Sequence, residues 1–285
     1  MENNIPTLQH SSTPVFHVGT SGYSFEDWLG TFYPSGLSQP KMLPFYAAQF
    51  DTVEVNFTYY RLPTARTTAG MANKTPDDFT FFVKAHQSFT HDRDLAAREK
   101  FLEGLAPMQE CGKLAGLLFQ FPQSFKNNEK NRAYLRAVKE EFNDHTLAIE
   151  FRDRSWDTEP VYSFLDQHDL SFVCVDEPEI STLFPRKAEV TNDTGYVRFH
   201  SRNGANWYKD MTKRYDYLYS EKEMKEWLPM FKAIAKRARN IFVYFNNCHQ
   251  GQAARNAKEI KKLIKDAGIG KQKRKEEDFE LDGSP

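Results

Sequence analysis

Short runs of apolar, β-branched and aromatic residues recur along the chain at fairly even spacing. Eight such runs begin at Val15, Asp51, Phe79, Ala115, Thr146, Leu170, Gly195 and Asn240. Most are too short for helices, and they are rich in the Val, Ile, Phe and Tyr residues that strands prefer. The pattern therefore predicts eight β-strands.

Helical patterns of apolar positions lie between most of these predicted strands. In residues 128–144 the side chains of Leu135, Val138 and Phe142 fall on one helical face. A capping-box spacing of Ser220 and Glu223 predicts another helix start. Residues 177–194 carry two prolines and no clear period, so we expect the helix between the sixth and seventh strands to be weak or missing.

Alternation of strands and helices is typical of a parallel sheet covered by helices. Eight strands without a clear break favour a single TIM-like (β/α)8 barrel over 15–266, and a doubly wound open sheet is the alternative. No dinucleotide or Walker A glycine motif follows a strand, which argues against a nucleotide cofactor. We expect residues 1–14 and the charged tail 267–285 to be disordered.

Charged residues interrupt the predicted strands in a regular way. In "LAIEFRD", from Leu147, apolar side chains alternate with Glu150 and Arg152. Because successive strand residues face opposite sides, the apolar set faces the helices and the charges face the barrel interior. We expect the following polar residues near the carboxyl ends of strands on the interior side: Glu54, Asn56, Lys84, His86, Gln120, Glu150, Arg152, Asp176, Arg198, His200 and Asn246.

In a barrel these positions converge on one mouth, where the active sites of this fold lie. A satisfied internal ion-pair network is the alternative, because three acids are matched by three bases. Buried charges are costly, however, and apolar replacements are often as stable. A chain that keeps six ionic groups at one end is therefore expected to use them.

The predicted roles follow from the chemistry of each side chain. Two carboxylates can hydrolyse an acetal or ester, so we assign acid–base roles to Glu54 and Glu150 and expect a hydrolase. The remaining predicted catalytic residues are Asp176, as a third carboxylate, and His200, as a proton shuttle. The predicted substrate contacts are an anion clamp of Lys84, Arg152 and Arg198, together with Tyr23, Asn56, Tyr60, His91, Gln120, Trp156 and Asn246. The aromatic members could instead pack loops over the barrel.

Other chemistries are less favoured. Lys84 could form a Schiff base, but flanking acids would keep it protonated. Magnesium, manganese or zinc would accept the carboxylates and His200, yet no H-x-H or HExxH spacing is present and the nearby cations compete for the same oxygens. We therefore expect no cofactor and no metal, with a divalent ion as the alternative.

Composition sets the expected partners. The 285 residues carry a formal net charge of −1, so a small anionic substrate is favoured over nucleic acid, which stays an alternative, as does a non-catalytic ligand sensor. Three widely spaced cysteines and the absence of an apolar signal or membrane segment predict a cytoplasmic protein with no membrane partner.

Seven motifs in order resemble the YecE-like family, domain of unknown function family 72. They are "VGTSGYSFEDWLGTFYP", "FDTVEVNFTYYRLP", "FTFFVKAHQSFTH", "LLFQFP", "AIEFRDRSW", "YVRFH" and "VYFNN", and the resemblance covers about 15–264. It implies a TIM-like barrel and no particular chemistry. Many relatives read "RxHG" where this chain reads "RFHSRNG", so a ligand contact after His200 is not carried over.

Overall fold

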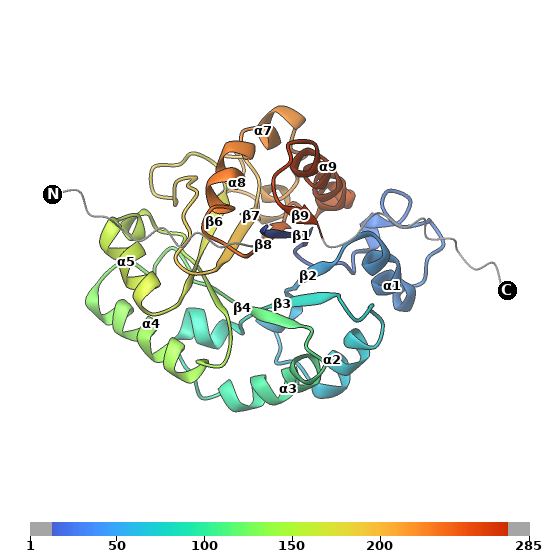
Figure 1. The fold of residues 1–285 in the computed structure, drawn as a ribbon. Coiled ribbons are helices and arrows are strands. Elements are labelled where there is room, and N and C mark those ends of the chain that lie inside the picture. Colours follow the sequence, from blue (N-terminus) through green and yellow to red (C-terminus); the bar gives the residue numbers. More distant parts are fainter. Residues whose placement is uncertain (1–12, 273–285) are drawn as a thin grey trace.

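A computed structural model describes residues 13–272. Strands and helices alternate around a central barrel (Figure 1). The strands are β1 (Val15–Thr20), β2 (Thr52–Val55), β3 (Thr80–Lys84), β4 (Leu114–Gln120), β5 (Leu147–Glu150), β6 (Ser171–Asp176), β7 (Thr194–Phe199), β8 (Asn240–Phe245) and β9 (Lys271–Gln272). The α-helices are α1 (Gln39–Gln49), α2 (Ala65–Ala72), α3 (Arg98–Glu110), α4 (Glu129–Glu141), α5 (Glu159–Gln167), α6 (Met211–Arg214), α7 (Glu221–Lys225), α8 (Leu228–Ile234) and α9 (Gln252–Asp266). Short helical turns are η1 (Glu26–Trp28), η2 (Phe57–Tyr59), η3 (Ser88–Asp92), η4 (Arg154–Trp156) and η5 (His249–Gly251).

The strands form one parallel sheet in the order β2-β3-β4-β5-β6-β7-β8-β1-β9. The sheet curls until β1 meets β2 through an isolated parallel bridge between Ser21 and Glu54. The added strand β9 pairs with Val15 and Phe16 at the other end of β1. The predicted TIM-like barrel is therefore confirmed, with a seam between its first two strands.

Tyr46 and Gly19 hold this seam together. The Tyr46 hydroxyl accepts a hydrogen bond from Thr20 N at 2.8 Å and donates to Thr52 O at 3.1 Å, so it links β1 to β2. A Cβ atom on Gly19 would lie 2.2 Å from Thr52 O, so only glycine permits this approach of the two strands.

Aromatic side chains fill the barrel interior below the strand ends. Phe82 lies 4.6 Å from Tyr196 and 5.2 Å from Phe242, and Tyr196 lies 5.4 Å from Tyr244 between ring centroids. These side chains are buried. The interior is thus a packed core, and polar groups can be reached only near the carboxyl ends of the strands.

The connections mostly match the pattern in the sequence. No helix forms between β6 and β7 in the described chain, as predicted. Ser220 and Glu223 form the predicted capping box, but the helix that follows is broken into α7 and α8. Pro229 lies in the first turn of α8 and has no N–H to continue the preceding helix, which accounts for the break.

The carboxyl-terminal end of the described chain differs from the prediction. Residues 267–272 were expected to begin a disordered tail, but they turn back and form β9 against β1. Lys271 N donates to Pro14 O at 2.8 Å, so both ends of the described chain meet there. The predicted disorder of 1–12 and 273–285 lies outside the described residues.

Candidate active site at the barrel mouth

A buried set of ionic side chains lies at the carboxyl ends of the strands. We call it the ionic cluster, and its members are Glu54, Glu150, Arg152, Glu177, Arg198 and His200. Their strands are separated widely in sequence, and the barrel brings them together because side chains of one parity face its interior. The predicted convergence of Glu54, Glu150, Arg152, Arg198 and His200 is therefore observed.

Arg198 is the centre of the ionic cluster. Its Nε lies 2.9 Å from Glu54 Oε2 and its Nη2 lies 2.6 Å from Glu54 Oε1, which makes a bidentate pair. Tyr196 donates its hydroxyl to the same Glu54 Oε2 at 2.7 Å. Both oxygens of Glu54 are thus occupied, and its side chain is fully buried. This geometry assigns Glu54 to positioning Arg198.

Glu150 joins the two arginines. Its Oε2 accepts from Arg198 Nη1 at 2.5 Å, and its Oε1 lies 2.9 Å from Arg152 Nε and 3.2 Å from His200 Nε2. Burial alone would raise the pKa of Glu150, but Arg198, Arg152 and His200 together hold it well below its usual range. Glu150 is therefore a carboxylate at neutral pH.

His200 is neutral in this arrangement. Burial, followed by repulsion from Arg152, lowers its pKa to about 3. Because a carboxylate only accepts hydrogen bonds, Nε2 carries the proton and donates to Glu150, and Nδ1 accepts from Asn246 Nδ2 at 3.1 Å. His200 thus orients Glu150, and Asn246, predicted as a substrate contact, fixes the tautomer.

Glu177 completes the ionic cluster and was not predicted as a site residue. Arg152 Nη1 lies 2.7 Å from Glu177 Oε2, while Glu177 Oε1 is buried without a hydrogen-bond partner. Burial raises the pKa of Glu177 to about 7, although Arg152 opposes the shift. Arg152 therefore lies between an ionised carboxylate and a carboxyl group that is half protonated near neutral pH.

Lys84 lies beside the ionic cluster at the end of β3, together with two other predicted contacts. Its Nζ donates to Gln120 Oε1 at 2.9 Å and lies 4.5 Å from the centre of the Tyr59 ring. The Tyr59 hydroxyl lies 3.2 Å from His91 Nε2, and His91 is exposed. This group links the interior of the mouth to its rim.

Asp176 lies outside the ionic cluster. It pairs in register with Phe199, which faces the helices, so its side chain leaves the barrel on the outer side. Its oxygens accept from Arg202, Tyr219 and Trp227 at 2.7, 3.0 and 2.6 Å. The structure thus does not bring the predicted third carboxylate to the mouth, and its partners indicate that it anchors the segment after β7.

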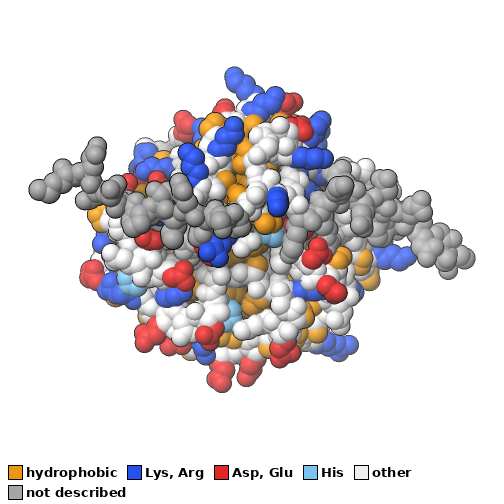
Figure 2. All heavy atoms as spheres, in the orientation of Figure 1, with side chains coloured by type: hydrophobic (Ala, Val, Ile, Leu, Met, Phe, Trp, Pro, Cys, Tyr) orange, Lys and Arg blue, Asp and Glu red, His pale blue; other side chains and the backbone are white. Residues whose placement is uncertain are grey.

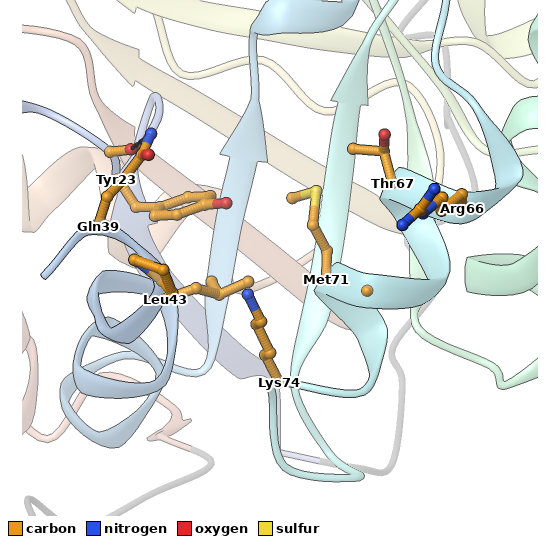
Figure 3. A pocket seen from close by; sticks show the side chains of 10 residues that line it. Tyr23, Gln39, Leu43, Arg66, Thr67, Met71 and Lys74 are labelled. Carbon is orange, nitrogen blue, oxygen red and sulfur yellow. Dashed lines mark hydrogen bonds between the residues drawn. The ribbon is translucent and has the colours of Figure 1, made fainter.

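Three predicted aromatic contacts also lie apart from the ionic cluster. Trp156 is buried, stacks on Phe151 at 4.3 Å and donates to Phe125 O, so it packs the loop, as the alternative interpretation held. Tyr60 is 74% exposed and lines the mouth. Tyr23 lines a separate cavity of about 410 Å³ between α1 and α2, where Figure 3 shows its ring directed toward Met71.

Two hollows adjoin the ionic cluster. One, of about 370 Å³, is lined by Ser21, Asn56, Tyr60, Tyr215, Asn246 and neighbouring residues. Ser21 Oγ contacts Arg198 Nη2 at 3.4 Å, and Asn246 contacts His200, so this hollow lies directly above the ionic cluster. Asn56, a predicted substrate contact, has a buried Oδ1 without a partner. The second hollow, of about 420 Å³, is lined by Glu177, Arg154, Arg186, residues 178–181 and residues 183–185.

Residues 200–219 cover the ionic cluster between these hollows. The buried Trp207 ring lies 5.8 Å from the Arg152 guanidinium and 6.5 Å from the His200 ring. At the tip of this segment, the Tyr208 hydroxyl contacts Gln123 at 3.2 Å. The segment begins where "RFHSRNG" departs from the usual family motif, and it places an aromatic ring beside Arg152 and His200.

Neither the surface charge nor the placement of possible metal ligands indicates a second kind of site. Figure 2 shows Lys and Arg side chains interspersed with Asp and Glu around the edge of one face, without a continuous patch of one sign there. Within residues 13–272, no three His, Cys, Asp or Glu side chains are placed to share a metal ion. None of the helices in the same range has the length and hydropathy needed to cross a bilayer.

Comparisons with known proteins agree with the fold. UPF0759 protein YunF of Bacillus subtilis (strain 168) is 33% identical over 270 residues, which cover 88% of this chain and 95% of that protein. A DUF72 family protein of Thermotoga maritima superposes with a TM-score of 0.82 at 42% identity, over 88% of this chain and 99% of the other. A DUF72 family protein of Enterococcus faecalis gives 0.79 at 29% identity, over 88% and 96%. The family described as "Protein of unknown function DUF72" matches residues 17–278. The chain therefore belongs to the DUF72 family, as its seven motifs predicted.

Proposed function

We propose that the barrel mouth is the active site of an enzyme that binds a small anionic substrate, phosphorylated or sugar-like. Carboxyl groups of the ionic cluster supply the acid–base chemistry, and hydrolysis is the first reaction class to test. The proposal places the substrate in the hollows that adjoin Asn246 and Glu177. It requires residues 200–219 to move before a substrate reaches Glu150.

One observation carries the proposal. Arg152 holds two carboxyl groups whose pKa values are pushed in opposite directions, well below the usual range for Glu150 and up to about 7 for Glu177. Pairs of this kind separate acid from base in many active sites. Glu177 can therefore donate a proton near neutral pH, while Glu150 stays a carboxylate.

The charge balance supports an anionic substrate. When Glu177 is protonated, the carboxylates of Glu54 and Glu150 are matched by Arg152 and Arg198. Lys84 in its protonated form then adds a positive charge, and within residues 13–272 no carboxylate lies within 4.0 Å of its Nζ. An anion would supply the missing partner and lower the cost of burying the lysine.

Inorganic phosphate is expected to stabilise the folded protein through Lys84. At concentrations near ten times its dissociation constant, phosphate should raise Tm by about 2–4 °C, because it binds only the folded state. The Lys84→Met variant should lose this rise and stay folded, since methionine has a similar volume. Differential scanning calorimetry across a phosphate titration provides the measurement. Lys74→Met, in the separate cavity between α1 and α2, serves as the control and should keep the rise. Equal stabilisation of both variants would place the anion elsewhere.

Loss of the proton donor is expected to abolish turnover. Chromogenic phosphate esters and glycosides serve as substrates, and Glu177→Gln should lower kcat by about 100-fold or more, because glutamine cannot donate the proton. Glu141, which is 50% exposed in its side chain and ends α4 at the side of the barrel opposite the mouth, provides the matched variant Glu141→Gln, which should keep full activity. Phosphate stabilisation without product from any of these substrates would favour the non-catalytic sensor and count against hydrolysis.

A further inference from the structure

Lys84 is held in place at the interior side of the mouth. Thr58 Oγ1 donates to Lys84 O at 2.7 Å, which fixes the end of β3 beside η2. The amine contacts one neutral acceptor, Gln120 Oε1, and the face of Tyr59. The residue as a whole is half-buried.

The carboxylates near Lys84 are occupied by arginines. Both oxygens of Glu54 and Oε2 of Glu150 contact Arg198, and Glu150 Oε1 contacts Arg152. The objection raised from the sequence, that flanking acids keep Lys84 protonated, assumed direct pairing with these acids. In the structure both acids are paired with arginines, and Lys84 Nζ contacts Gln120 Oε1.

We propose that Lys84 is a nucleophilic amine that forms an imine with a carbonyl compound carrying an anionic group. The inference rests on the proposed active site and narrows its substrate class to keto acids or phosphorylated aldehydes and ketones. It also changes what the acid–base pair does, because a bound imine needs proton transfer at neighbouring carbons.

The chemistry balances without a co-reactant. The nitrogen lone pair attacks the carbonyl carbon, and a proton moves from the nitrogen to the former carbonyl oxygen, which gives a neutral carbinolamine. Protonation of its hydroxyl releases water as nitrogen forms the double bond, which gives a protonated imine. Tyr59 is the titratable group in contact with Lys84, and its link to the exposed His91 provides a route for protons to the rim.

The local electrostatics favour the neutral amine. Burial, with repulsion from Arg198 next, lowers the pKa of Lys84 to about 7. About half of the Lys84 side chains are then neutral at pH 7, compared with roughly one in a thousand or fewer for an ordinary lysine. Lys113 is buried in a different setting. Its Nζ donates to Ala72 O and Thr75 O at 2.7 and 2.8 Å, so its amine has a structural role.

Reductive trapping tests the inference. The full-length protein is mixed at pH 7 with pyruvate, glyoxylate or dihydroxyacetone phosphate and reduced with sodium cyanoborohydride, and peptide mass spectrometry locates the adducts. We expect at least tenfold more adduct at Lys84 than at any surface lysine or at Lys113, with a rate that rises through a midpoint near pH 7. Uniform labelling of surface lysines, or no adduct at Lys84, would overturn the proposal.

The variants separate this inference from the proposed function. Lys84→Arg keeps the positive charge but cannot form the imine, so it should keep phosphate stabilisation and lose the adduct. If wild type and Lys84→Arg are both stabilised by phosphate and neither is trapped, the imine is excluded and the anion site stands. If phosphate stabilises neither and the wild type is trapped, the imine stands without the anion site. The pH midpoint of adduct formation is measured on the wild-type protein alone. This part of the test therefore still decides the question if a variant does not fold.

Discussion

Replacing Arg198 by methionine is expected to lower the free energy of unfolding by about 3–5 kcal/mol, because it leaves two buried carboxylates without their shared partner. Glu54 would lose both bonds of its bidentate pair, and Glu150 would lose its contact at 2.5 Å. Neither group is reached by water, since both side chains are 0% exposed. Urea denaturation at pH 7 measures the loss.

An exposed arginine–glutamate pair provides the control. Arg136 contacts Glu129 at 2.5 Å, the same distance as Arg198 to Glu150, but those side chains are 43% and 75% exposed. Arg136→Met should therefore cost about 0–1 kcal/mol, and less at high salt. Adding Glu54→Gln to the Arg198→Met variant should recover part of its loss. If the Arg198 and Arg136 variants lose equal stability, the ionic cluster is not as buried and dependent on Arg198 as described.

The sequence predicted most of the ionic cluster because several strands carry apolar residues on one parity only. In β5 and β7 the charged residues Glu150 and Arg198 alternate with apolar neighbours, and alternation alone assigns the interior face. Strand β6 reads "SFVCVD" and is apolar on both parities, so the same rule gave no answer there. The charge of Asp176 at the end of β6 favoured it as a site residue. Val175 pairs in register with Arg198, which faces the interior, so Glu177, two residues further on, faces the interior as well.

The positions of side chains in the loops could not be predicted from the sequence. Aromatic residues after strands can line a mouth or pack beneath a loop, and the strand pattern does not distinguish these roles. Trp156 stacks inside the fold, whereas Tyr60 is exposed at the rim. Within residues 200–219, the buried Trp207 ring lies beside Arg152, and its position comes from tertiary contacts of an irregular segment. Periodicity carries no information about such a segment.

The pH dependence of stability is expected to reveal Glu177. Its folded pKa of about 7 lies above the unfolded value near 4.3, so the folded state binds the proton more tightly. The contribution of Glu177 is therefore most favourable below about pH 4.3 and is lost as the pH rises through about 7. The total loss is on the order of 3 kcal/mol. Glu150, whose pKa is lowered, has the opposite dependence, so the two must be separated by mutation.

Glu177→Gln isolates this contribution because glutamine resembles the protonated acid. The variant and the wild type should be equally stable near pH 4, and the variant should become more stable by about 3 kcal/mol at pH 8. Urea denaturation at intervals between pH 4 and 8 measures the difference, and Glu179→Gln should follow the wild type throughout. A constant difference across this range would show that Glu177 does not titrate near neutral pH. That result would remove the proton donor on which the proposed acid–base chemistry depends.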